Sequence, residues 1–285
     1  MVAPMAVPLS PGRPAPARSS KLIMGGGHVR SASVPCETHP VVMDVEAQLV
    51  ALRAWTSNPG PNPLSLAHVR ALLCVLDELL HLPLAHRALA ACAGDGLLDG
   101  FLVLADAFGT FLAALLALRQ HAADLRAARR RRDAAKLASA ARAQRQVGKE
   151  LQHLAAAVAR EAARCARASM LASSAAADEL EIARTVAEAV NDTAVASAAV
   201  FSEVADAAAA LASSSPKKRL PPLVMNASSS SSSRSSSKEQ REAAALGKLQ
   251  ELEQCIGELE SESHKVFRSL VQTRVSLLNI HTPTF

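Results

Sequence analysis

Two pairs of side chains have types and spacings that could support chemistry. Asp77 and His81 stand one helical turn apart, but zinc needs three or four convergent ligands and no second pair is in register. Asp99 and Asp106 could form an acid–base pair, yet seven residues of helix separate them by about 10.5 Å, too far to share a proton. We expect Asp77 and His81 to be capped or solvent-facing. We expect the two aspartates to form a polar seam that meets basic groups of a neighbouring helix.

The sequence also lacks the common catalytic and phosphate-binding motifs. It contains no G-x-S-x-G and no H-E-x-x-H, and the glycines at 25–27 lack the Lys-Ser or Lys-Thr of a P-loop. The five cysteines, at 36, 74, 92, 165 and 255, are scattered without close pairs, which is typical of free thiols in a reducing compartment. The sequence therefore offers no catalytic residues, no cofactor motif and no metal site, and a cryptic enzyme is the remote alternative.

The composition indicates which elements must carry the remaining side chains. Hydrophobic residues make up 49% of the 285 residues, and many of them are alanines, which favour closely approaching helices. One Trp, six Phe and no Tyr argue against sheets and against an aromatic platform for nucleic-acid bases. We predict an all-α fold: an elongated up-down bundle of about five to six helices, with no specific nucleic-acid partner.

The segment 97–118 is the predicted centre of this bundle. Its sequence, LLDGFLVLADAFGTFLAALLAL, places large apolar side chains on nearly every face of a helix, so other helices or lipid must surround it. Its 22 residues are long enough to cross a bilayer, but Asp106 near its middle opposes insertion by about 2.5–3.5 kcal/mol. We interpret it as a buried helix of the bundle, with a membrane span as the alternative.

Periodicity and breakers divide the chain into four regions. A tail at 1–37 precedes a helical bundle at 38–211, a linker at 212–237 and a C-terminal helical segment at 238–285. Within the bundle, apolar spacings of three and four predict helices near 40–55, 64–80, 84–91, 97–125, 137–165 and 178–204. The last two could instead form one bent rod.

The C-terminal segment has the most regular apolar pattern. Spacings of three and four alternate over more than four heptads, which is typical of a coiled-coil seam. Its members are Leu249, Leu252, Ile256, Leu259, Ser263, Val266, Leu270, Thr273, Leu277 and Ile280. Because Ser263 and Thr273 weaken the seam, we expect the helix to dock on its own bundle in a monomer; self-association through the seam is the alternative.

Two segments have a composition typical of disorder. The tail holds six prolines and a glycine run, and it has no acid before Glu37, which also resembles a plastid transit peptide. The linker contains a serine tract and Pro216-Lys217-Lys218-Arg219, which resembles a nuclear import signal. We expect a cytoplasmic protein; membrane-associated, nuclear and plastid locations are the alternatives.

A phosphorylation motif lies in the tail. Arg30-Ser31-Ala32-Ser33-Val34-Pro35 matches R-S-x-S-x-P, the preferred phosphoserine ligand of 14-3-3 proteins. Arg30 lies three residues before Ser33, which suits basophilic kinases, and a phosphate would add about 1.5–2 negative charges. We expect phosphorylated Ser33 to dock a 14-3-3 dimer; the alternative is a chance match in a serine-rich tail.

Basic residues gather behind the central helix. Residues 119–149 contain ten Lys or Arg against Asp124 and Asp133, including the run Arg129, Arg130, Arg131 and Arg132. One interpretation is a solvated helix C-terminus, where cations interact well with the helix dipole. The alternative is a nuclear-import or anionic-surface patch.

Three stretches resemble one known family. They are His28-Val29-Arg30-Ser31-Ala32-Ser33-Val34-Pro35, Leu97-Leu98-Asp99-Gly100-Phe101-Leu102-Val103-Leu104-Ala105-Asp106 and Thr273-Arg274-Val275-Ser276-Leu277-Leu278-Asn279-Ile280. In this order and spacing they resemble the plant-specific BYPASS-like family, long described as a domain of unknown function. The resemblance implies a helical, non-enzymatic regulatory or adaptor protein linked to root and shoot development, acting through protein partners. The alternative is a membrane-associated signalling component with 97–118 in lipid.

Overall fold

A computed structural model describes residues 39–60, 63–91, 95–171, 177–213 and 231–282, and these form helices with no strand among them. Side chains at 169–179, 231–239, 241 and 242 are outside the description. The helices are α1 (Pro40–Ser57), α2 (Ala67–Leu80), α3 (Pro83–Ala91), α4 (Asp95–Arg130), α5 (Ala134–Leu171), α6 (Ala177–Ser213) and α7 (Ser231–His281). The predicted all-α helical bundle is confirmed.

The first helices begin and end at recognisable local signals. The ring nitrogen Nδ1 of His39 accepts a hydrogen bond from the Val41 amide, and Pro40 occupies the first turn, where its missing N–H costs nothing. α2 begins at Ala67 rather than at the predicted residue 64. The reason is local: the Ser65 hydroxyl accepts a hydrogen bond from the Ala67 amide, and Leu66 is buried just outside the helix.

α4 forms the centre of the bundle because three other long helices cover its apolar surface. It packs against α5, α6 and α7, and its large side chains Phe101, Phe108, Phe111, Leu115 and Leu118 are fully buried. Phe201 of α6 stacks on Phe111 with ring centroids 4.2 Å apart and meets Phe108 edge-on. The interpretation of 97–118 as a buried core helix therefore agrees with the packing.

Two described helices, α4 and the 180–213 part of α6, are long and apolar enough to cross a membrane by length and composition. The core helix of a soluble protein passes the same test. About half of the most apolar window of each helix is buried inside the bundle, 44% for α4 and 50% for α6. Leu102 and Leu116 are the large apolar side chains of α4 that remain exposed.

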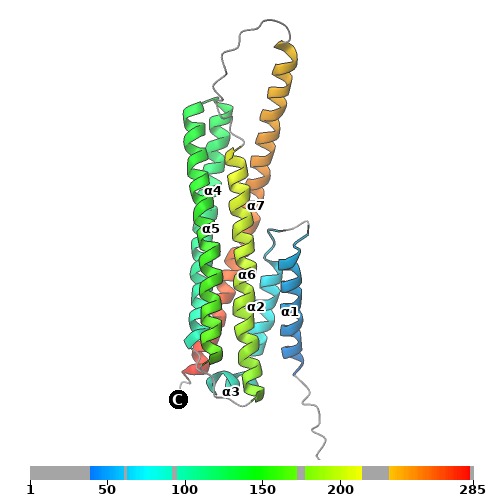
Figure 1. The fold of residues 1–285 in the computed structure, drawn as a ribbon, viewed down its shortest axis with the longest axis vertical. Helices are drawn as coiled ribbons and strands as arrows, with labels where there is room; N and C mark the ends of the chain where they lie inside the picture. Colours follow the sequence, from blue (N-terminus) through cyan, green and yellow to red (C-terminus); the bar gives the residue numbers. More distant parts are fainter. Residues whose placement is uncertain (1–38, 61–62, 92–94, 172–176, 214–230, 283–285) are drawn as a thin grey trace, which may run out of the picture. The chain divides into compact units, whose positions relative to one another are not determined.

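The long helices alternate in direction (Figure 1). α5 and α6 are separate antiparallel helices, so the single bent rod is wrong. α7 runs antiparallel to α4, because Arg126 pairs with Glu253, Arg119 pairs with Glu260, and Arg274 reaches the Leu98 carbonyl. α5 contacts α4 and α6 and no other described helix, whereas α7 also packs against α2.

The helices on either side of the serine-rich linker extend further into it than the sequence predicts. α6 runs to Ser213 and α7 begins at Ser231, so both ends of the predicted linker, 212–237, are helical. Residues 1–38 and 214–230, where disorder is predicted, lie outside the described residues. All ten members of the predicted C-terminal seam are buried. The periodicity therefore located the inward face of α7 correctly, while its first turns escaped detection because serines carry no apolar signal.

Close helix packing depends on a glycine of α4. A Cβ built on Gly100 would lie 2.7 Å from the Cγ1 atom of Val190 in α6, which is far inside van der Waals contact. Val190 is fully buried and β-branched, so its methyl groups have little room to move. Gly257 of α7 offers a contrast, because nothing lies within 4 Å of a Cβ at that position.

We expect Gly100→Ala to destabilise the fold by about 1 kcal/mol. Overpacking costs about 1–3 kcal/mol, and the better helix propensity of alanine returns up to about 1 kcal/mol. Gly257→Ala is the matched control and should stabilise the fold by about 0.5–1 kcal/mol. Urea unfolding followed by circular dichroism measures both, and equal shifts for the two variants would contradict the packing argument.

Candidate functional site

The two predicted sites differ in how far the structure describes them. Arg30, Ser31, Ser33 and Pro35, which form the predicted 14-3-3 motif, lie outside the described residues. The basic run Arg129–Arg132 is described and lies where α4 ends and the chain turns into α5. We call residues 129–133 the arginine turn.

The arginine turn closes α4 with a Schellman motif. The Asp133 amide donates to the Ala128 carbonyl (3.0 Å), and the Arg132 amide donates to the Arg129 carbonyl (3.0 Å). Arg132 occupies the left-handed position of this motif, with φ of 55°, and it is the only non-glycine residue with positive φ among those the structure describes. Glycine is the usual residue there, because a Cβ costs about 1–2 kcal/mol in this conformation.

The same turn starts α5. Asp133 Oδ1 accepts hydrogen bonds from the Ala135 amide (3.1 Å) and the Lys136 amide (3.0 Å), so Asp133 is the N-cap of α5. Arg130, Arg131 and Arg132 are exposed, whereas Arg129 is half-buried. The turn therefore presents three exposed guanidinium groups at the C-terminal end of α4, where the helix dipole also favours cations.

The wider basic run does not form one patch. Arg119 and Arg126 point away from the arginine turn to α7, where they pair with Glu260 at 2.7 Å and Glu253 at 2.9 Å. The remaining basic residues of the run lie on α5. The sequence could not separate these groups, because the acidic partners are more than a hundred residues away along the chain.

The two pairs of side chains singled out in the sequence, Asp77 with His81 and Asp99 with Asp106, form no catalytic or metal site in the described part of the chain. His81 Nδ1 donates to the backbone carbonyl of Asp77 at 2.6 Å, which is local helix capping. Asp99 and Asp106 are both exposed. The pKa of Arg164 on the neighbouring helix α5 is raised by Glu161 and, to a smaller extent, by Asp99, so Asp99 faces a basic group there as expected, whereas Asp106 makes no ion pair with a described residue. The described residues contain no group of three or more side chains that could hold a metal ion.

Two described thiols are poorly placed for nucleophilic chemistry. Burial raises the pKa of the Cys165 thiol and of the Cys255 thiol above the ordinary value. Both groups are therefore protonated near neutral pH, and a protonated thiol is a weak nucleophile.

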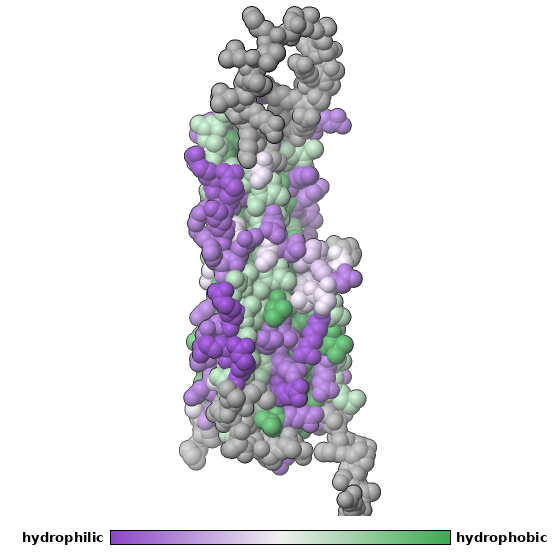
Figure 2. Space-filling model, in the orientation of Figure 1, coloured by the Kyte–Doolittle hydropathy of each residue, from purple (hydrophilic) through white to green (hydrophobic). Residues whose placement is uncertain are grey.

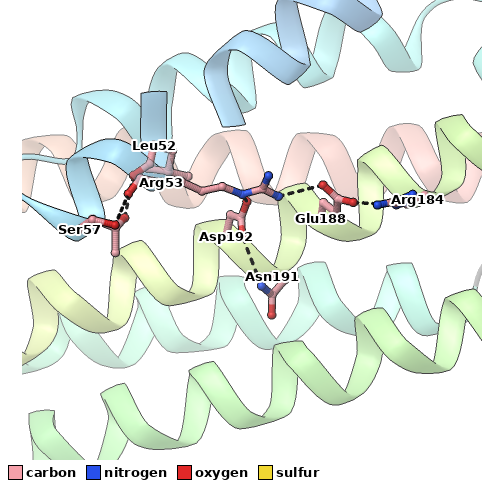
Figure 3. A network of polar contacts seen from close by, with 8 residues as sticks. Leu52, Arg53, Ser57, Arg184, Glu188, Asn191 and Asp192 are labelled. Atoms are coloured by element: carbon pink, nitrogen blue, oxygen red, sulfur yellow. Dashed lines mark hydrogen bonds and ion pairs between the residues drawn. The ribbon is translucent and has the colours of Figure 1, made fainter. Parts of the chain in front are cut away.

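A second polar cluster joins α1 to α6 (Figure 3). Arg53 of α1 donates from Nε to Asp192 (2.5 Å) and from Nη2 to Glu188 (2.8 Å), and Arg184 donates to the other oxygen of Glu188 (2.8 Å). The hydrogen bond from Arg53 lowers the pKa of Glu188 below its ordinary value of 4.5, although partial burial opposes this. Nothing in the sequence pairs these helices. The only sequence feature that hints at an arginine partner is that Glu188 and Asp192 stand one helical turn apart.

One surface depression lies beside this cluster, and another lies beside a second polar cluster, formed by Arg70 of α2 with Glu262 and Lys265 of α7. The first, of about 330 Å³, lies between α1 and α6, and the second, of about 490 Å³, lies between α2 and α7. Some charged side chains on their walls are held in ion pairs, such as Arg53–Glu188 at the first depression and Arg70–Glu262 at the second. These ion pairs join neighbouring helices, so the clusters are structural contacts between helices.

We expect Glu188→Gln to lower the stability by at most about 1 kcal/mol, because Arg53 is half exposed and solvent screens the pair. The loss should depend on pH. The folded-state pKa of Glu188 is lowered, so its contribution is present above about pH 4.5 and disappears as the pH falls through the folded-state value. Chemical denaturation of both proteins between about pH 3 and pH 6 measures this. A difference that stays constant over that range would contradict the assignment.

We expect Arg132→Gly to stabilise the fold by about 1 kcal/mol, because glycine adopts positive φ without strain. Arg130→Gly is the matched control. It removes the same side chain from the last turn of α4, where glycine costs about 0.5–1 kcal/mol, so it should destabilise. Thermal unfolding of both variants checks the opposite signs, and destabilisation by Arg132→Gly would show that the side chain itself holds the turn.

Comparison with known proteins places the chain in a family. A family model described as Protein BPS1 matches residues 65–280, which is most of the chain. No curated protein and no solved structure matches it. The match agrees with the resemblance carried by the sequence stretches near 97–106 and 273–280. The chain therefore belongs to the BPS1 family, the BYPASS-like proteins, which are plant developmental regulators and are not known as enzymes.

Proposed function

We propose that this protein is an adaptor in root and shoot development, that it acts through protein partners, and that its N-terminal tail is the regulated element. The observation that carries the proposal is the tail sequence from Arg30 to Pro35, which matches R-S-x-S-x-P at every specified position. Membership of a family of developmental regulators supports a regulatory role.

The bundle supports an adaptor role through its surface charge. α5 carries seven Lys or Arg against Glu150 and Glu161, and its neighbour α6 carries seven Asp or Glu against Arg184. Opposite charges on adjacent long helices give extended faces that distinguish partners by electrostatic complementarity. Such faces suit a protein that holds other molecules in place.

The tail would act as the switch through added charge. A kinase that recognises Arg30 three residues upstream would phosphorylate Ser33, and the phosphate would bring about 1.5–2 negative charges and three acceptor oxygens. A 14-3-3 dimer binds such a group through clustered arginines. Pro35 then directs the chain out of the binding groove.

We expect Ser33→Ala to reduce capture of the full chain by 14-3-3 from growing root about tenfold or more, because the variant loses charge-assisted hydrogen bonds. Ser20→Ala is the matched control, since it removes a tail serine outside the motif. Pull-down followed by quantitative mass spectrometry compares the three proteins. Equal capture of the Ser33→Ala and wild-type proteins would rule out docking at Ser33.

The rival function is a membrane-associated signalling component with α4 in lipid. It is favoured by the length and apolar composition of α4, and it would require the buried phenylalanines to leave α5, α6 and α7. Carbonate extraction of plant membranes distinguishes the two proposals. An adaptor is released into the supernatant, and an inserted protein stays with the membrane.

A further inference from the structure

The outer face of α5 carries a row of cations, interrupted between Lys149 and Arg160, that the proposed function does not use. Starting from Arg142, steps of three and four residues lead along one side of the helix to Arg167. The exposed basic members of this row are Arg142, Arg145, Lys149, Arg160, Arg164 and Arg167. We call this set the α5 basic row.

The α5 basic row is straight and narrow. At 100° per residue its members fall within an arc of about 100°, and 25 residues of helix extend over about 37 Å. Glu150 and Glu161, the acids of α5, lie at the edge of this arc or beyond it. Figure 1 shows α5 as one uninterrupted helix, and hydrophilic side chains gather along that side of the molecule (Figure 2).

Most of these cations have no protein partner among the described residues. Arg164 pairs with Glu161 of its own helix, and Arg145 donates to the Ala212 carbonyl of α6 at 3.2 Å. Arg142, Lys149, Arg160 and Arg167 make no ion pair with a described residue. No described helix covers this face, because α5 contacts only α4 and α6. The row is thus an exposed surface on which cations predominate.

We propose that the α5 basic row is a docking surface for an anionic phospholipid bilayer, which it binds peripherally through the lipid headgroups. A bilayer is flat, so a straight row of cations meets headgroups along its whole length at once. Each Lys or Arg near an anionic bilayer contributes about a fivefold gain in binding. The gap between Lys149 and Arg160 contains the exposed residues Ala156 and Ala157 rather than large apolar residues. The contact is therefore electrostatic, and the helix does not insert.

Two other anionic partners fit this surface less well. Phosphates of a nucleic-acid duplex follow a helical path with a turn of about 34 Å, so they leave a straight row of about 37 Å well before its end. Single strands need aromatic side chains for base stacking, and the row contains none. The acidic helix α6 of a second copy would be a complementary partner, and the oligomeric state tests for it.

The test is co-sedimentation of the full chain with vesicles of phosphatidylcholine alone and of phosphatidylcholine with one third phosphatidylserine. We expect binding only to the anionic vesicles, and release at high salt, because salt screens exposed charges. The variant Arg142→Gln/Lys149→Gln/Arg160→Gln should bind roughly 100-fold more weakly. Glutamine keeps the helix propensity, so circular dichroism should be unchanged.

The matched control is Arg87→Gln/Lys248→Gln/Arg268→Gln, which removes three exposed cations from α3 and α7. It should change vesicle binding less than about threefold, since these residues lie off the row. Equal losses for the two triple variants would show that only net charge matters and would overturn the proposal. So would binding to phosphatidylcholine alone, or binding that resists salt, because each indicates insertion.

Two further outcomes would assign the row to another partner and overturn the proposal. One is tight binding of a DNA duplex at the salt concentration where vesicles do not bind. The other is a dimer in light scattering that only the α5 variant abolishes. We expect neither. Loss of 14-3-3 capture by Ser33→Ala is independent of all these measurements, so the two proposals can fail separately.

Discussion

The structure depends on the need to bury the large apolar side chains of α4. Its phenylalanines and most of its leucines pack against α5, α6 and α7, while a stripe that includes Asp99, Leu102, Asp106 and Leu116 remains exposed. Each large apolar side chain that is fully buried contributes about 1.5–3 kcal/mol relative to an exposed one. The three phenylalanines 108, 111 and 201 gather where α4 meets α6, and their mutual packing fixes the register of these two helices.

Small residues allow the surrounding helices to approach closely enough. Gly100 of α4 faces Val190, and a Cβ on Gly148 of α5 would lie 3.2 Å from the Ala205 carbonyl oxygen of α6. Alanines fill much of the interface between α5 and α6, where larger side chains would hold the helices apart. A core made this way leaves the long charged side chains of both helices on their outer faces.

The outcome is a bundle in which charge is sorted by helix. α5 is basic and α6 is acidic, whereas ion pairs join α1 to α6 and α4 to α7. The arginine turn is consistent with this arrangement, because it keeps a cation at a position where glycine would be more stable.

The sequence by itself determined which residues face inward. Apolar spacings of three and four predicted a helix near residues 40–55, where α1 lies, and identified all ten buried residues of the α7 seam, because a helix returns to the same face every 3.6 residues whatever it packs against. Two of the three stretches that resemble the family, 97–106 and 273–280, lie within the residues that the family model matches, and the stretch 28–35 lies outside them. Only the tertiary structure decided which helices are neighbours, and therefore which charged side chains form ion pairs. Arg119 and Arg126 form ion pairs with α7, whereas Arg142 and Lys149 form none with a described residue, although all four belong to one basic run. Periodicity is a property of one helix, whereas an ion pair needs two helices that the packing of α4 brings together.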